Sequence, residues 1–357
     1  MEGIANRNIL KFSRITKLNS LKEASEKRLL KPAQVGLLVV AALFLLAPAS
    51  PVLAEEQAHL SQWVANFKKE ALRRGISIRI LNQAFENFEP IAQIIELDRY
   101  QPESKLSLEQ YLNKVVRKSR VEKGRDILSR HRSLLGEVYE RYGVQPRFLV
   151  ALWGIETAFG VMTGKFPVIH AIATLAYSGR RSTYFRKELV QALRIAEAGH
   201  ISLSEMRGSW AGAMGQLQFM PSAFHNFGVD FSGDGRIDIW NDLGDAFASA
   251  ANYLSRSGWS TGHAWGREVR LPRSFDRMMI GLETRNRLSQ WQSLGVRRVS
   301  GKDLPKKPDL FGSILQPDGK EGRAFVVYKN FRVILAWNKS DYFGIAVGTL
   351  ADRIVRR

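Results

Sequence analysis

The chain has 357 residues, 45% of them hydrophobic, so it is long enough for one large domain or two ordinary ones and can bury a substantial core. It contains no cysteine, which excludes disulfides, thiolate metal ligands and a lipidated cysteine. Its net charge is +19; the first 54 residues hold eight Lys or Arg and three Glu, so +5 belongs to them and +14 to the remainder. Such a charge favours a polyanionic partner, which could be nucleic acid, an anionic membrane surface or an acidic cell-wall polymer.

Sequence motifs argue against nucleic acid among these partners. The chain has no RNP-like strand, no zinc-finger spacing and no phosphate-binding glycine loop. A solvated basic surface without a partner is the alternative to a membrane surface or an acidic polymer.

The N-terminal segment has the features of a secretory signal peptide. Residues 35–47 form an apolar run of thirteen, preceded by basic residues and followed by Val52-Leu53-Ala54, so we expect cleavage after Ala54. The run is short for a membrane span. Because the basic region before it is long, an uncleaved anchor and a misplaced start codon are the alternatives.

The spacing of apolar residues after this leader predicts a mainly helical chain. The expected helices are a pair over 57–88 with a turn at Arg74-Gly75, two over 107–142, and single helices over 146–160, 168–177, 182–199, near Pro221, and over 245–255, 331–338 and 342–354. Short strands are expected at 267–271 and 324–328. The sequence has no internal repeat and no low-complexity linker, which favours one continuous unit with small lobes.

One carboxylate, Glu156, lies in the otherwise apolar stretch ALWGIETAFG. The helix that carries it is expected to start at Pro146 and to end at Gly160, so Glu156 should lie near the helix C-terminus and face a cleft. An ionised carboxylate is costly to remove from water, so this position needs an explanation.

Two interpretations of Glu156 are open. In the structural one, its carboxylate pairs with a basic residue, for which the sequence offers Arg180, Arg181 and Arg186. In the functional one, apolar neighbours exclude water and raise its pKa toward about 6, so that it holds a proton at neutral pH and gives it to a leaving oxygen.

The segment 207–224, RGSWAGAMGQLQFMPSAF, has the composition of a sugar-binding surface. Its small residues let the backbone approach a bulky ligand, while its polar side chains offer neutral hydrogen bonds and its aromatic rings offer flat apolar faces. The polar residues are Ser209, Gln216 and Gln218, and the aromatic ones are Trp210, Phe219 and Phe224. Close helix packing through small residues is the alternative.

The segment VDFSGDGRIDIWNDLGDAF resembles an EF-hand loop. Asp230, Ser232 and Asp234 occupy loop positions 1, 3 and 5, Gly235 is the turn residue at position 6, and the backbone carbonyl of Arg236 would be the ligand at position 7. Oxygen ligands at alternating positions suit Ca²⁺.

The last position of this loop departs from the EF-hand pattern. Position 12 is Asn241, where a bidentate Glu is usual, so we expect the closing carboxylate to be Asp245, with Asp238 and Asp242 as substitutes. Fewer charges imply a weak calcium affinity, in the range of about 10⁻⁴ to 10⁻³ M. A metal-free Asp/Gly turn is the alternative.

The order of these motifs resembles the lytic murein transglycosylases of the MltB type, and the match runs over residues 57–355. The matching stretches are LDRYQPE, ALWGIETAFG, FPVIHAIATLAY, RGSWAGAMGQLQFMPSAF, VDFSGDGRIDIWNDLGDAFASAANYL and NFRVILAWNKSDYFGIAVGTLADRI. The resemblance implies a mainly α (α+β) fold, in which a lysozyme-like helical catalytic domain carries small flanking lobes and an EF-hand-like calcium loop.

The resemblance also divides the chain. After the signal peptide or anchor over 1–54, one unit spans 55–357. It consists of a helical N-terminal lobe over about 55–142, a lysozyme-like core over about 143–262 with the calcium loop at 230–245, and a C-terminal lobe with closing helices over about 263–357.

The family cleaves the β-1,4 bond between N-acetylmuramic acid and N-acetylglucosamine in peptidoglycan and leaves a 1,6-anhydromuramic end. Glu156 matches its catalytic acid. The cleft positions match Ser209, Gln218, Asn252, Tyr253, Trp337, Asn338 and Tyr342. Trp337 stands where relatives often carry Tyr, so a phenol hydroxyl is not available at that position.

A single carboxylate suits this reaction. Glu156 would first protonate the glycosidic oxygen and then, as a carboxylate, take the proton of the C6 hydroxyl, so that no water is consumed. A goose-type lysozyme-like hydrolase and a non-catalytic peptidoglycan-binding protein are the two rival functions. The resemblance further implies a periplasmic monomer that acts on glycan strands, with structural Ca²⁺ and no organic cofactor; association with the envelope and with other cell-wall enzymes is left open.

Overall fold

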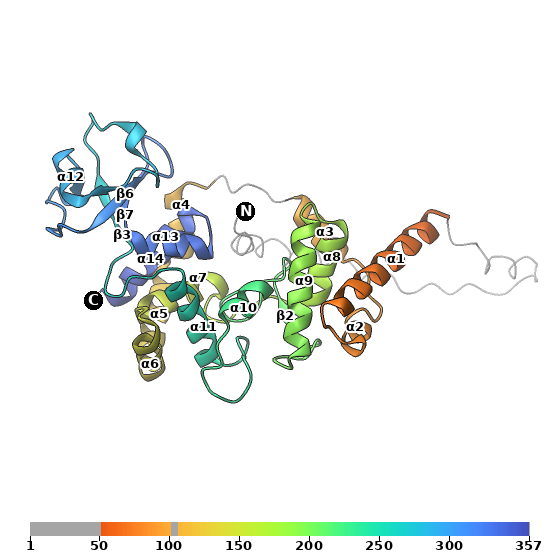
Figure 1. The fold of residues 1–357 in the computed structure, drawn as a ribbon. Helices are drawn as coiled ribbons and strands as arrows, with labels where there is room; N and C mark the ends of the chain where they lie inside the picture. Colours follow the sequence, from red (N-terminus) through yellow and green to blue (C-terminus); the bar gives the residue numbers. More distant parts are fainter. Residues whose placement is uncertain (1–50, 101–105, 357) are drawn as a thin grey trace, which may run out of the picture.

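The structure, a computed structural model, describes residues 51–100 and 106–356 (Figure 1). The signal peptide expected at 1–54 lies outside this part except for the start of α1 (Pro51–Arg73). No helix in the described part is both long enough and apolar enough to span a membrane. The predicted mainly α fold is confirmed, with strands confined to two small sheets.

Helices make up the body of the molecule. In Figure 1, α1 extends from one end, α8 and α9 lie next to it, and α5, α7, α13 and α14 follow toward the lobe that carries the strands. Their bounds are α2 (Ile78–Ala84), α3 (Ala92–Arg99), α4 (Leu108–Val115), α5 (Lys118–Arg130), α6 (Arg132–Tyr142), α7 (Pro146–Thr157), α8 (Val168–Ser178), α9 (Ser182–Glu197), α10 (Pro221–Phe227), α11 (Leu243–Arg256), α12 (Leu288–Ser293), α13 (Lys329–Trp337) and α14 (Asp341–Val355).

The prediction of two helices over 107–142 was wrong, because three helices occupy this segment. Ser107 starts α4 with a capping box, in which its hydroxyl accepts the Gln110 N–H and the Gln110 side chain accepts the Ser107 N–H. The chain then bends at Val116 and Arg117 before α5 begins. The buried side chain of Arg120 turns back to the Val115 carbonyl at the end of α4. This break involves neither Gly nor Pro, so the sequence gives no local signal for it.

Five of the strands form a separate lobe, in which four antiparallel pairings give the order β4-β6-β7-β3-β5. The strands β3 (Gly266–Arg270) and β7 (Ala324–Val327) were expected, whereas β4 (Asn286–Arg287), β5 (Arg297–Arg298), β6 (Phe311–Leu315) and α12 were not. This lobe has its own core, in which the α12 indole of Trp291 donates to the Gly312 carbonyl on β6 at 2.8 Å. We call it the β lobe, residues 264–328.

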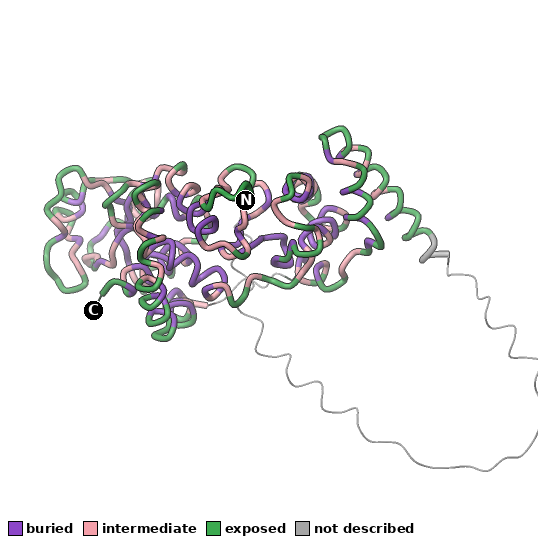
Figure 2. Tube along the Cα trace, turned by 90° about the horizontal axis from the view of Figure 1, so that it is seen from below, coloured by how far each residue is buried: buried purple, intermediate pink, exposed green. Residues whose placement is uncertain are grey.

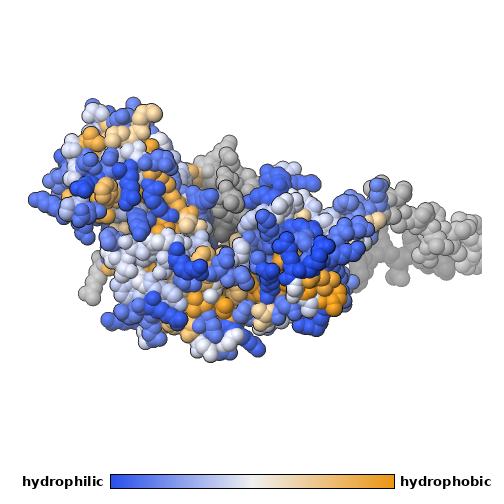
Figure 3. Space-filling model, in the orientation of Figure 1, coloured by the Kyte–Doolittle hydropathy of each residue, from blue (hydrophilic) through white to orange (hydrophobic). Residues whose placement is uncertain are grey.

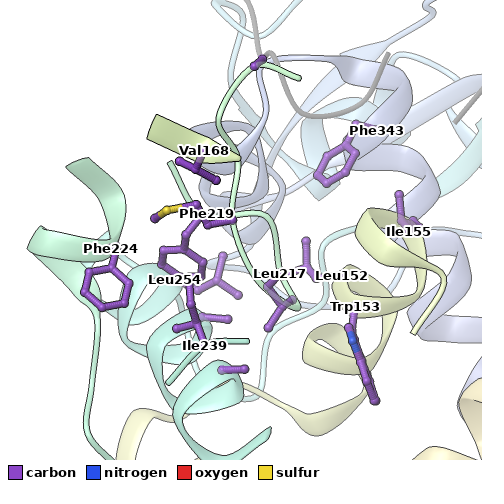
Figure 4. Close-up of a cluster of buried hydrophobic side chains, with 14 of the residues drawn as sticks. Leu152, Trp153, Ile155, Val168, Leu217, Phe219, Phe224, Ile239, Leu254 and Phe343 are labelled. Carbon is purple, nitrogen blue, oxygen red and sulfur yellow. The ribbon is translucent and has the colours of Figure 1, made fainter. Parts of the chain in front are cut away.

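The main core lies between the helices of the body. Every residue of α7 from Phe148 to Thr157 is buried, and α5 and α14 pack on it. Figure 2 shows the buried residues along the inside of these helices, with exposed residues on the outer faces. Apolar side chains from α7, α8, α11 and the segment after β2 meet in one cluster (Figure 4). The two-residue ladder of β1 (Phe166–Pro167) and β2 (Arg207–Gly208) joins the loop after α7 to the glycine-rich segment.

Candidate active site

The C-terminus of α7 places Glu156 two residues before an unusual turn. Ala158, Phe159 and Gly160 all have left-handed backbone conformations, with φ of 52°, 62° and 81°. This conformation costs a non-glycine residue about 1 to 2 kcal/mol, so surrounding contacts must hold it. Thr157 provides them, because its hydroxyl donates to the Gln216 carbonyl at 2.8 Å and accepts the Gly160 N–H at 3.0 Å.

Glu156 is buried, with 5% of its surface exposed, and its two oxygen atoms differ. Oε1 accepts the indole N–H of Trp337 at 3.0 Å, whereas Oε2 has no hydrogen-bond partner among the described residues. Burial raises the pKa of Glu156 to about 8, an effect that the bond from Trp337 partly opposes. The side chain is therefore protonated at neutral pH, and the proton-bearing oxygen is free to donate.

The ion-pair interpretation of Glu156 was wrong. Arg180 and Arg181 lie 3.9 and 3.8 Å from the carboxylate of Asp98, and Arg186 binds Glu70 at 2.6 Å. These guanidinium groups are thus paired elsewhere. The functional interpretation is the one compatible with the observed contacts.

Trp337, the last residue of α13, is held by aromatic neighbours. Its ring lies edge-on to Phe219 and Tyr253, with centroid distances of 5.1 and 4.9 Å. The Tyr253 hydroxyl donates to the Ala336 carbonyl at 2.7 Å, next to Trp337 in the chain. Two of the expected cleft residues, Tyr253 and Trp337, are therefore in contact with each other, and Trp337 also contacts Glu156.

Ser209 and Gln218 stabilise the glycine-rich segment. The Ser209 hydroxyl accepts the Ala213 N–H at 3.0 Å. The Gln218 amide donates to the carbonyl groups of Thr163 and Gly215 at 2.9 and 3.1 Å, and its backbone is left-handed with a φ of 55°. Both side chains are buried.

The expected sugar-stacking faces in this segment were wrong. Trp210, Phe219 and Phe224 are at most 5% exposed, so their rings belong to the core and offer no free face. Figure 4 shows Phe219 and Phe224 in the apolar cluster with Leu254 and Ile239. The alternative of close helix packing does not hold either, because residues 207–220 lie outside the helices and their aromatic rings pack into the core.

The asparagines differ in their surroundings. The Asn338 side chain is 2% exposed; its Oδ1 accepts the Ser340 N–H, and its Nδ2 has no partner among the described residues. Asn252 donates to the Phe227 carbonyl at 3.0 Å, which ties α11 to α10. No hydrogen bond links Asn252 to Glu156 in the described part of the chain.

Two tyrosines, Tyr111 and Tyr342, lie close together on α4 and α14. The Tyr342 ring on α14 lies 5.8 Å from that of Tyr111 on α4. Burial and the nearby Glu156 raise the pKa of Tyr111. Burial and a hydrogen bond with Asp318 raise the pKa of Tyr342 to about 12. Tyr111 was missed because a single aromatic residue on an amphipathic helix carries no distinguishing signal.

Hydrogen bonds from backbone N–H groups to Asp230 hold the loop at 230–245. Asp230 accepts the N–H groups of Gly233, Asp234 and Gly235, and Gly235 has a left-handed φ of 89°, as the tight turn at position 6 requires. Asp234 and Ser232 are exposed. The chemical types of these oxygen donors fit a hard cation such as Ca²⁺.

Asp245 stabilises this loop from α11. Its Oδ1 accepts the N–H groups of Phe231 and Ser232, and its Oδ2 accepts that of Asp238. In the described residues, no three His, Cys, Asp or Glu side chains converge as a metal site requires. Asp245 therefore closes the loop through backbone amides, and its role as a metal ligand stays a prediction.

Comparison with known proteins identifies relatives. The sequence matches the family described as Transglycosylase SLT domain over residues 59–352. It is 32% identical over 254 residues to membrane-bound lytic murein transglycosylase B of Escherichia coli strain K12. The aligned region covers 68% of this chain and 66% of that protein.

Solved structures give the same result. SltB3 from Pseudomonas aeruginosa in complex with NAG-anhNAM-pentapeptide superimposes with a TM-score of 0.80 at 44% identity, covering 82% of this chain and 78% of that one. Escherichia coli Slt35 in complex with calcium superimposes with a TM-score of 0.70 at 28% identity, covering 83% and 92%. These matches confirm the lysozyme-like helical fold expected from the sequence.

Proposed function

Because this chain belongs to the Transglycosylase SLT domain family, we propose that it is a lytic murein transglycosylase. It would cleave the β-1,4 bond between N-acetylmuramic acid and N-acetylglucosamine in peptidoglycan and leave a 1,6-anhydromuramic end. The observation that carries this proposal is the buried, singly hydrogen-bonded carboxyl group of Glu156. The bound NAG-anhNAM-pentapeptide of SltB3 supports it.

The geometry of Glu156 suits an acid that later acts as a base. The proton on Oε2 goes to the glycosidic oxygen as the bond from that oxygen to the muramic C1 breaks. The N-acetyl group of the sugar can stabilise the positive charge at C1. The Glu156 carboxylate then takes the proton of the C6 hydroxyl while the C6 oxygen bonds to C1, so the acid form is restored and no water is consumed.

A second carboxylate is not needed in this reaction. A glycoside hydrolase generally has two, separated by about 5 Å or by about 6.5 to 9.5 Å. Among the described residues, no carboxylate contributes to the raised pKa of Glu156. The chemical form of the product therefore distinguishes the transglycosylase from a goose-type hydrolase.

Trp337 would keep the proton of Glu156 on the reactive oxygen. An indole N–H can only donate, and the carbonyl oxygen of a protonated carboxyl is a better acceptor than its hydroxyl oxygen, so this contact favours the proton on Oε2. A tyrosine hydroxyl could donate or accept and would not impose this choice.

The remaining cleft positions are proposed to hold the substrate. The free Nδ2 of Asn338 offers one buried donor to a sugar carbonyl or hydroxyl. Tyr253 and Tyr342 would border the cleft, whereas Ser209, Gln218 and Asn252 would act by shaping the loops beside it.

The chemical form of the product tests the function. Sacculi digested with the protein should release fragments that end in anhydromuramic acid and are lighter by one water than hydrolysed fragments in a mass spectrum. Fragments with reducing ends would identify a hydrolase. Binding without any release would identify a non-catalytic wall-binding protein.

We also propose structural Ca²⁺ in the loop at 230–245, supported by the calcium complex of Slt35. Asp230, Ser232, Asp234 and the Arg236 carbonyl would be its ligands, and Asp245 would complete the site. The ion would rigidify the loop and take no part in the reaction. Millimolar Ca²⁺ should raise the melting temperature relative to chelator, because a ligand specific to the folded state stabilises it. Asp234→Ala should remove this increase, and an equal increase in that variant would contradict the assignment.

The substrate implies a location. We propose a periplasmic monomer, exported by the leader, that acts on glycan strands and associates with the envelope at its periphery. Other cell-wall enzymes are a further class of proposed partner, and nucleic acid is not one.

A further inference from the structure

The β lobe contains a pocket that none of the catalytic residues uses. Its volume is about 340 Å³, within the range of small-ligand sites. Strands β3 and β7, the hairpin between β6 and β7, and the short helix at Arg277–Met279 line it. Its charged residues are Glu268, Arg270, Arg277, Lys320 and Arg323. Four cations against one carboxylate give it an excess positive charge.

The pocket already holds one carboxylate, that of its own Glu268. Arg323 Nε and Nη2 contact the two oxygens of Glu268 at 2.8 and 2.5 Å, a bidentate arrangement. The Arg277 guanidinium binds the side-chain oxygen of Gln316. The pocket wall is thus shaped for planar oxygen acceptors.

Two cations of the pocket are left without such a partner. The side-chain nitrogen atoms of Arg270 and Lys320 make no hydrogen bond or ion pair with any described residue, and both side chains are exposed. Two free cations at the mouth of a concave site attract an anion more strongly than the same charges on a flat surface.

We propose that this pocket binds the free carboxylates of a peptidoglycan peptide stem, a site that rests on the proposed function. Arg270 and Lys320 would contact the carboxylates, and Glu268 would lie near enough to the bound peptide to favour an ammonium group. A short peptide that carries both charges fits a pocket with both signs better than a uniformly anionic ligand does.

The concave shape favours a peptide over a membrane surface. A flat anionic bilayer would reach the exposed rim of the lobe but not fill a pocket of this volume. In Figure 3, hydrophilic residues cover much of the visible face of the lobe at the upper left, with apolar patches between them.

The pocket is mechanically linked to the catalytic body. Lys320 and Asp318 lie in the same hairpin between β6 and β7. Asp318 accepts the Leu108 N–H of α4 and binds the Tyr342 hydroxyl on α14. A stem held in the pocket would therefore be held at a fixed position relative to the cleft, and it could belong to a strand next to the one being cleaved.

Binding of a soluble stem peptide tests the site. The probe is the peptide freed from sacculi by an amidase, titrated calorimetrically into Glu156→Gln protein. Arg270→Glu/Lys320→Glu should weaken binding about tenfold or more, since two attractions become repulsions. Lys306→Glu/Lys307→Glu is the matched control, because both lysines are exposed on the same lobe and do not line the pocket. The same peptide with amidated carboxylates should not bind at the pocket.

Three results would overturn the site. The first is that the pocket variant and the control bind the peptide equally well. The second is that the amidated peptide binds as well as the free one. The third is that the pocket variant loses binding to phosphatidylglycerol vesicles and keeps its peptide binding, which would assign the pocket to a membrane.

Turnover separates this site from the proposed function. In protein that keeps the native Glu156, Arg270→Glu/Lys320→Glu should raise the KM for peptide-bearing sacculi and leave kcat on peptide-free glycan unchanged. A loss on both substrates would also count against the site. Reducing-end products would refute the transglycosylase assignment while the calorimetric result still decides the pocket.

Discussion

At the residue level, the pKa of Glu156 links catalysis to folding stability. Its pKa is about 8 in the folded chain and near 4.5 when exposed, so the folded state binds the proton more tightly. Stability from this group is fully present below pH 4.5 and is lost as the pH rises through 8. At pH 7 this loss is on the order of 3 kcal/mol.

Glu156→Gln should therefore lose activity and gain stability. We expect turnover to fall by about 10²- to 10⁴-fold, the range for removal of a general acid. The melting temperature should exceed that of the wild type by a few degrees at pH 8 and by almost nothing at pH 4, because Gln has no proton to lose. Thermal melts at both pH values measure this. Exposed Glu140→Gln is the control, and a pH-independent difference would contradict the buried acid.

Replacing Trp337 should shift the pH profile. The indole hydrogen bond lowers the pKa of Glu156, so Trp337→Phe should raise that pKa and move the alkaline limb of kcat/KM to higher pH. Turnover should also fall, since Oε1 is no longer held. Trp337→Tyr keeps a donor and should stay near the wild-type midpoint. An alkaline limb that moves to lower pH in the Phe variant would exclude this role.

The sequence located the acid but not its surroundings. Glu156 stood out because a carboxylate in an apolar run is costly, and the contacts agree with the functional interpretation. The partner of its oxygen, 181 residues away, could be named only through family resemblance. Side chains such as Gln218 could not be assigned from type alone, because a polar residue that hydrogen-bonds its own loop and one that faces a ligand have the same letter.

At the level of elements, one turn joins the β lobe to the helical body. Asp318 accepts the Leu108 N–H with both oxygens, at 3.1 and 2.8 Å, and thus places a negative charge at the N-terminus of α4. It also binds Tyr342 on α14. A single exposed side chain therefore connects three elements that are far apart in the sequence.

Asp318→Asn should loosen this connection without unfolding either part. Loss of the charged acceptor should cost about 1 kcal/mol, and amide hydrogen exchange should accelerate in the hairpin over 316–322 and in the first turn of α4. Mass-spectrometric exchange resolves these segments. Asp309→Asn, an exposed change on the same lobe, should leave both unaffected. Unchanged exchange in the Asp318 variant would show that the hairpin is held by packing alone.

Helices were predictable where their apolar faces are long and regular. The full burial of α7 and the amphipathic pattern of α11 are visible in the sequence. The two-residue strands β4 and β5 are defined only by their pairing with β6 and β3, which no local pattern encodes. The break between α4 and α5 likewise depends on the tertiary contact of Arg120 with Val115.

At the level of the whole molecule, the excess of basic residues predicts salt-dependent binding to the wall. The chain carries +14 after residue 54, and peptidoglycan stems carry carboxylates. Attraction between exposed charges is screened as the Debye length falls from about 10 Å at 0.1 M salt to about 3 Å at 1 M. Glu156→Gln protein, which binds without turnover, should therefore be released from pelleted sacculi as salt increases over this range. Chitin, an uncharged polymer of N-acetylglucosamine, is the control and should retain the protein equally at both salt concentrations. Salt-independent retention by sacculi would mean that contacts with sugar, and not the net charge, determine the affinity.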